Sequence, residues 1–140
     1  MTALVADFDC PTQEGKFRSE PVAAGVLIYA GALAVLDEAD GYVHPGSTKT
    51  GLIALGRAEH QANNSAGAAG AITLRIRRGV FLWNNSPAGA DLIATVNIGQ
   101  QAFIVDDNTV ALTSATGTRS AAGRIYDIDS QTGNVWVEVI

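Results

Sequence analysis

The sequence predicts an all-β protein, a compact β-sandwich or barrel-like domain with a short N-terminal arm and at most one short helix. The first observation is a period of two, in which apolar and polar residues alternate as they do in half-buried strands. It is clearest over residues 71–77 and 134–140. The second is the frequency of turn-forming residues, including 15 glycines among 140 residues. Many short strands separated by turns are typical of sandwiches and barrels.

The expected strands follow one another along the chain after residue 14. In the segment AITLRIR, Ile72, Leu74 and Ile76 share one face of a strand. In NVWVEVI, three valines share one face, with Trp136 and Glu138 opposite. The other expected strands comprise residues 15–19, 26–30, 32–36, 51–58, 79–83, 101–105, 109–113 and 123–128. Stretches rich in Gly, Asn, Asp and Pro, which favour turns, are found at residues 37–41, 44–47, 106–108 and 131–134.

The length of the chain corresponds to a single domain. Residues 15–140 are expected to form one β-rich domain, in which the only candidate helix is a short turn that begins at Asp91 and ends at Gly99. Residues 1–14 carry little pattern, and we expect them to form an arm that becomes ordered only against a partner.

Composition and charge exclude several classes of protein. The net charge is −5, and only nine residues are basic, so direct nucleic-acid binding is not expected. The longest apolar run, residues 22–36, is interrupted by glycines and is shorter than the roughly 20 residues of a membrane helix. The N-terminus has no signal-peptide pattern, and Cys10 is the only cysteine. These features predict a protein without a disulfide that is made in the cytoplasm and does not bind a membrane.

The tripeptide Asn-Asn-Ser occurs twice, at residues 63–65 and 84–86. The similarity between the two stretches ends after about ten residues, which argues against a structural repeat. A glycosylation signal would need a secreted chain. We interpret both stretches as surface turns, and the small residues of the first, including Gly67 and Gly70, would allow close approach of a second subunit.

The sequence contains no recognisable catalytic or metal-binding pattern. Neither Ser65 nor Ser86 lies in a nucleophile motif, and the two histidines have no third metal ligand in pattern. Residues 127–138 resemble a calcium loop, but Thr132 occupies the position that requires glycine. We therefore expect no enzyme activity, no metal and no cofactor.

Four segments in succession resemble the capsid cement or decoration proteins of tailed bacteriophages and prophages. They are GVLIYAGALAVLDEADGYVHPGS, LIALGRAEHQANNSAGAAGAITLRIRRGVFLW, IGQQAFIVDDNTVALT and AGRIYDIDSQTGNVWVEV, within residues 17–140. The resemblance implies a β-rich structural protein, often a homotrimer, on the outer surface of the virion head. Such proteins bind the major capsid protein where capsid subunits meet, and they stabilise the shell against the pressure of packaged DNA.

The expected contacts with the capsid or with other subunits follow from this resemblance. The apolar residues of the arm would lie across the capsid or a neighbouring copy, and an arginine cluster would face an acidic capsid surface. The candidate residues are Leu4, Val5, Phe8, Gly67, Gly70, Arg75, Arg77 and Arg78. Two alternatives remain open, namely a β-domain that binds carbohydrate or a host surface, and another structural protein of a phage head or tail.

Overall fold

The computed structural model describes residues 2–87 and 89–140, so residue 1 of the predicted arm lies outside the described residues. Within these ranges nearly all regular structure is β, and the predicted fold class is confirmed. The strands are β1 (Phe17–Pro21), β2 (Leu27–Ile28), β3 (Leu33–Asp37), β4 (Val43–Pro45), β5 (Leu52–Ala58), β6 (Ala62–Asn63), β7 (Thr73–Arg77), β8 (Gly79–Asn85), β9 (Gln101–Ile104), β10 (Thr109–Ala111), β11 (Ala121–Ile128) and β12 (Val135–Val139).

The N-terminal half forms a five-stranded sheet with the order β1-β7-β5-β3-β4. Its strands alternate as the sequence predicts, since Leu74 and Ile76 of β7 are fully buried while Thr73 and Arg75 are exposed. The buried face packs into an apolar core with Val22, β2 and β6. β1 is an outer strand of this sheet, so only one of its edges is hydrogen-bonded.

The C-terminal half forms a closed barrel with the order β10-β8-β12-β11-β9. In the pairing of β8 with β12, Val135 lies opposite Trp83 and Val137 opposite Phe81. These four side chains are all buried in the barrel core. The three valines of β12 that the sequence places on one face therefore point inwards, as predicted.

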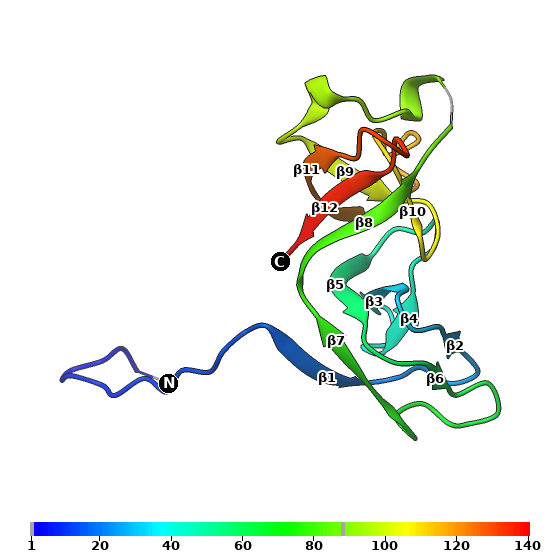
Figure 1. The fold of residues 1–140 in the computed structure, drawn as a ribbon. Coiled ribbons are helices and arrows are strands. Elements are labelled where there is room, and N and C mark those ends of the chain that lie inside the picture. Colours follow the sequence, from blue (N-terminus) through cyan, green and yellow to red (C-terminus); the bar gives the residue numbers. More distant parts are fainter. Residues whose placement is uncertain (1, 88) are drawn as a thin grey trace.

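The two sheets belong to one unit. In Figure 1, β7 and β8 form one long, curved path that leads from the five-stranded sheet to the barrel. Leu33 and Val35 of β3 and Leu52 of β5 belong to the same apolar cluster as the barrel residues. Burial of this shared cluster opposes separation of the sheets, because exposing it would cost roughly 25 cal/mol for each Å² of apolar surface.

Several segments differ in detail from the sequence-based expectation, since β1 covers residues 17–21 in place of 15–19 and the short strand β6 was not expected. Residues 44–47 were expected as a turn, but Val43–Pro45 forms β4, where Pro45 is tolerated because the strand lies at the sheet edge. The candidate helix after Asp91 is replaced by two 3-10 turns, Gly89–Asp91 and Thr95–Asn97. None of the helical segments in the described ranges is long and apolar enough to cross a membrane.

Residues 2–14 form no strand or helix and are exposed along their whole length. Figure 1 shows this arm leaving β1 and running away from the sheets. Its large apolar side chains Leu4, Val5 and Phe8 are 73%, 100% and 62% exposed. Whether the arm becomes ordered against a partner stays a prediction.

Candidate interaction surface

The candidate functional surface lies on the pair of strands β1 and β7. The two strands are antiparallel, and Phe17 lies opposite Arg77 while Ser19 lies opposite Arg75. Directly opposed residues share one face of a sheet. Phe17 and the two arginines therefore lie together on the face opposite to the buried Leu74 and Ile76.

Three cationic side chains surround the ring of Phe17. The Cζ atom of Arg75 lies 4.1 Å from the ring centroid, and that of Arg77 lies 5.7 Å away. The Nζ atom of Lys16 also lies 5.7 Å from the same centroid. Each exposed contact of this kind stabilises the arrangement by about 0.5–1 kcal/mol. The ring thus holds several positive charges together on an exposed surface.

The basic residues of the described chain fall into two groups. Four of them bind carboxylates: Lys49 pairs with Asp37, Arg57 with Glu59, Arg119 with Asp91 and Arg124 with Glu138. The others form no ion pair within the described residues, and all lie on or beside β1 and β7. We call this group, together with Phe17, the basic edge: Lys16, Phe17, Arg18, Arg75, Arg77 and Arg78.

The backbone of β1 contributes to the same surface. The N–H of Arg78 donates to the carbonyl of Lys16, and the N–H of Val22 donates to that of Ile72, both at 3.0 Å. Because hydrogen-bonding groups alternate in direction along a strand, Phe17 and Ser19 turn their N–H and C=O groups away from β7. The basic edge therefore combines positive charge with backbone N–H and C=O groups that are not bonded to β7. An edge strand with such free backbone groups can pair with a segment of another chain.

The structure brings some of the predicted contact residues together and separates others. Arg75 and Arg77 share one face. Arg78 instead lies beside the junction of the arm with the domain, because a Cβ atom at Gly15 would lie 3.5 Å from Cζ of Arg78. The arm begins at the same end of the β1–β7 pair. The loop that contains Gly67 and Gly70 precedes β7 and lies at the other end, beside Pro21.

The glycines of that loop have contacts inside the fold. A Cβ atom at Gly67 would lie 2.0 Å from Oδ1 of Asn64, which is only 3% exposed. Gly70 has a φ of +79° and lies against the ring of Tyr42. The Asn-Asn-Ser stretches are therefore less superficial than expected, and Ser86 is buried as well. Whether the loop contacts another subunit stays a prediction.

Half of the basic edge was not predicted from the sequence. The three arginines of residues 75–78, which are close in sequence, were expected to act together, but Lys16, Phe17 and Arg18 were not included with them. These residues join the arginines only through the pairing of β1 with β7, which are separated by more than 50 residues. The available signal was the run KFR, a phenylalanine between two basic residues at the start of an expected strand.

A cluster of ionisable side chains follows β3. Asp37, Asp40 and His44 place potential ligand atoms within 4.8 Å of one another. Their oxygen atoms already have partners, because Asp37 accepts from Lys49 and from the N–H of Ala39, and Asp40 accepts from His44 Nε2 at 2.7 Å. These bonds account for the cluster as a hydrogen-bonded turn, and we assign no ion to it.

Hydrogen bonds lower the pKa of several aspartates in turns. The pKa of Asp37 is lowered mainly by Lys49, and that of Asp40 mainly by the N–H of Tyr42. The hydroxyls of Thr113 and Thr132 are the main causes of lowered pKa values at Asp91 and Asp129. Asp107 is the exception, since burial raises its pKa.

We expect the free energy of unfolding to fall at acid pH. A carboxyl with a lowered pKa stabilises the fold above its unfolded pKa, near 4, and this stabilisation is lost as the pH falls through the folded value. Four aspartates act in this direction, whereas protonation of Asp107 acts in the opposite one. Urea midpoints measured between pH 3 and 7 test this, and a midpoint that stays constant below about pH 4 would contradict it. Lys49→Gln should flatten the acid side of the profile.

Comparisons with known proteins do not identify the chain. A scan against protein-family models finds no matching family, and searches of curated proteins and of solved structures find no similar protein.

Proposed function

We propose that this protein is a structural virion protein that binds the outer surface of a phage head where capsid subunits meet and stabilises the head against the pressure of packaged DNA. The observation that carries the proposal is the basic edge, which concentrates the unpaired basic side chains of an acidic protein on one outer strand pair. The resemblance of four successive segments to decoration proteins supplies the class of partner.

The proposed partner surface is an acidic region of the major capsid protein. Guanidinium groups bind carboxylates through two parallel hydrogen bonds, so Arg75 and Arg77 are suited to such a surface. Phe17 would supply apolar contact at the centre of the interface. One such contact is weak, but a homotrimer would bind through three of them at once. Linked sites of this kind raise the overall affinity well above that of each site.

We expect Arg75→Gln combined with Arg77→Gln to weaken binding to undecorated heads by at least about tenfold at low ionic strength, because interface charge pairs are worth 1 kcal/mol or more when partly desolvated. The salt dependence of binding should also become shallower, since fewer charges are screened. Co-sedimentation of protein with heads over a range of salt concentrations measures both effects.

A matched control separates the local surface from the net charge. Asp106→Asn, at an exposed bend, and Asp127→Asn, at an exposed position near the end of β11, return the net charge of the double arginine variant to the wild-type value. Both keep the side-chain oxygen that accepts a local backbone hydrogen bond. Binding should stay weak in this compensated variant. Recovery to the wild-type affinity would show that overall charge, and not the basic edge, governs attachment.

A carbohydrate- or host-binding function is the second candidate. It is favoured by exposed aromatic residues, since Tyr126 on β11 and Trp136 on β12 are both exposed on neighbouring strands of the barrel. Sugars commonly pack against the side chains of Tyr and Trp, which combine an apolar aromatic face with a polar O–H or N–H group. Glycan-array binding that is lost with Trp136→Ala and retained in the arginine variant would favour this function over head attachment.

A further inference from the structure

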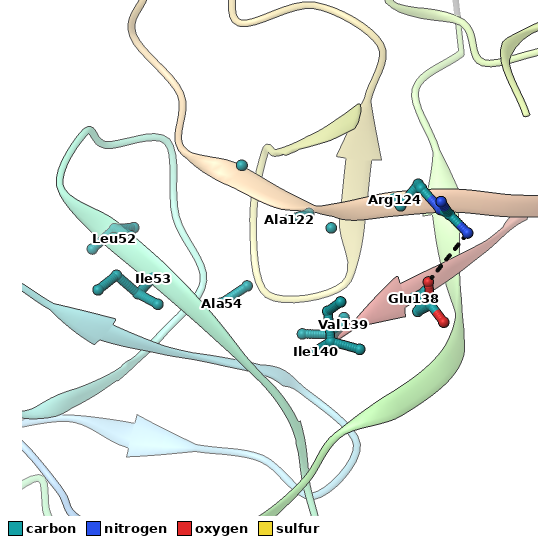
Figure 2. A pocket seen from close by; sticks show the side chains of 10 residues that line it. Leu52, Ile53, Ala54, Ala122, Arg124, Glu138, Val139 and Ile140 are labelled. Carbon is teal, nitrogen blue, oxygen red and sulfur yellow. Dashed lines mark ion pairs between the residues drawn. The ribbon is translucent and has the colours of Figure 1, made fainter. Parts of the chain in front are cut away.

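A groove lies at the junction of the two sheets. It has a volume of about 460 Å³, within the range of sites that bury a ligand or several large side chains. Figure 2 shows Ile53 and Ala54 of β5 on one side of it, and Val139 at the end of β12 with the following Ile140 on the other. We call it the junction groove. Its other lining residues are Leu52, Ala121, Ala122, Gly123, Arg124 and Glu138.

The groove is apolar along its length and basic at one end. A neighbouring hollow of about 240 Å³ shares Ile53, Ala54 and Ile140 with it and is bordered by Arg18 and Arg78 of the basic edge. The charges inside the groove itself are balanced, because Arg124 lies 3.7 Å from Glu138. An occupant that fits should therefore be apolar and should carry negative charge towards one end.

The arm of this same chain has that chemistry. Residues 2–14 read TALVADFDCPTQE, with three acidic residues and no basic one. Leu4, Val5 and Phe8 are its large apolar side chains, and each is more than half exposed in the single chain. In an extended arm Leu4, Ala6 and Phe8 share one face, while Val5, Asp7 and Asp9 share the other, so apolar and acidic side chains are presented within a few residues.

We propose that residues 3–9 of one copy bind in the junction groove of a neighbouring copy. Leu4 and Phe8 lie on the apolar floor around Ile53 and Ile140, and the carboxylates of Asp7 and Asp9, on the other face of the arm, meet the guanidinium groups of Arg18 and Arg78 at the basic end. The inference rests on the self-association included in the proposed function, but it does not depend on the identity of the head as a partner.

The geometry of the arm favours a neighbouring copy over the same chain. The arm joins the domain at Gly15, next to Arg78, so it leaves the domain at the basic end of its own groove. From there it runs away from both sheets (Figure 1). To enter the groove of its own chain, the arm would have to reverse its direction at Lys16. This residue is held in place because its carbonyl accepts a hydrogen bond from the N–H of Arg78. A copy that donates one arm and accepts another makes a head-to-tail contact, and contacts of this type form a ring, such as a trimer, when the rotation between successive copies closes.

Sedimentation of the full chain without heads tests the contact. The wild-type protein should associate as its concentration rises, and Phe8→Asp in the arm or Ile53→Asp in the groove should each raise the dissociation constant at least about tenfold, as expected for an anchoring side chain. Deletion of residues 2–14 should abolish association. The matched control is Val96→Asp, at a residue that is 83% exposed on the second 3-10 turn, and it should associate like the wild type.

Cross-linking identifies the occupant. The wild-type chain carries its only thiol, Cys10, on the arm, and it is mixed with a differently tagged Cys10→Ser/Ile53→Cys chain and a short bismaleimide. We expect a product that joins the two chains. A Cys10→Ser/Tyr29→Cys chain, with its thiol at an exposed position directly after β2 of the two-stranded β2–β6 sheet, should give much less of it. Because each chain has one thiol, this product cannot form within one copy.

The results that would overturn the inference differ from those that would overturn head attachment. A wild-type chain that remains monomeric, or a cross-linking yield no higher than that of the Tyr29 control, would overturn the arm–groove contact. Loss of association in both aspartate variants together with selective cross-linking at Ile53 would support it. Head binding that is insensitive to Arg75 and Arg77 would overturn only the proposed attachment surface.

Discussion

Replacement of Gly123 by alanine is expected to lower the free energy of unfolding by roughly 3–5 kcal/mol, since it combines backbone strain with overpacking against a neighbouring strand. Gly123 has a φ of +149°, a conformation that side chains with a Cβ atom rarely adopt. The new Cβ atom would lie 2.3 Å from the carbonyl oxygen of Glu138 and 3.0 Å from Cγ1 of Val137. Urea unfolding followed by tryptophan fluorescence measures the loss.

Neither strand can easily move to make room at Gly123. β12 is held on its other side by five register pairs with β8, from Val135 to Val139. β11 carries a register shift between Ala121 and Gly123 where it pairs with β9. Glycine at such an irregularity allows the strand to bend and lets a neighbouring backbone approach closely. The strain caused by the added methyl group would therefore weaken the pairing of β11 with β12, which is part of the closed barrel.

Gly133→Ala provides the matched control. Gly133 also has a positive φ, +77°, but no atom outside its chain neighbours would lie within 4 Å of a new Cβ atom. Its replacement should therefore cost only the strain of the backbone, about 1–2 kcal/mol. The difference between the two variants combines the contact with β12 and the difference between the two backbone conformations. Equal losses would show that this contact contributes nothing and that only the backbone conformation matters.

Local patterns predicted the strands well because alternation is a property of neighbouring residues. Leu74, Ile76 and the valines of β12 are buried, as their period of two indicates. Gly31, which lies between the expected strands 26–30 and 32–36, has a φ of +87° and separates β2 from β3. Residues 89–97 carried no comparable pattern, and there the structure has two short 3-10 turns, Gly89–Asp91 and Thr95–Asn97, in place of one helix.

The surface could be predicted only in part because it depends on pairing between distant segments. The spacing of Arg75 and Arg77 indicated that they share a face, and β1 confirms this by placing Phe17 between them. The sequence contains no indication that residues 16–18 pair with residues 76–78, nor that β5 approaches β11 and β12 to form the junction groove. Such contacts arise from topology, which composition and periodicity do not specify.

The two Asn-Asn-Ser stretches illustrate the same limit at the level of single residues. Asn63 and Asn64 are equivalent in the sequence, but Asn63 is exposed and Asn64 is buried. In the second stretch, the amide of Asn85 donates to the carbonyl of Ile93 at 2.8 Å and accepts from its N–H at 3.0 Å. In each stretch the second asparagine holds together segments that are distant in the chain, which no local turn rule indicates.

Asn64→Asp is the second substitution that we expect to lower the free energy of unfolding strongly, because the amide of Asn64 is buried. Its Nδ2 atom lies 2.8 Å from the carbonyl oxygen of Ala23, 2.9 Å from that of Ala68 and 3.4 Å from that of Val22. The side chain thus joins the loop before β7 to the segment after β1. Asn64→Asp has nearly the same shape but replaces the donor by a negatively charged acceptor. Three carbonyl oxygens would then face a carboxylate within the buried loop.

We expect Asn64→Asp to lower the free energy of unfolding at neutral pH by about 3 kcal/mol or more, because buried polar groups lose their partners and a charge is left unpaired. Asn63→Asp is the matched control, since Oδ1 of Asn63 only accepts, from the N–H of Ser65 at 3.1 Å and from its hydroxyl at 2.6 Å. A carboxylate can fill that role, so its effect should stay within about 0.5 kcal/mol, as for most surface substitutions. Lowering the pH protonates the new carboxyl and restores one donor, so part of the loss in the first variant should be recovered relative to the wild type. Similar losses in both variants would show that the buried amide does not organise this loop.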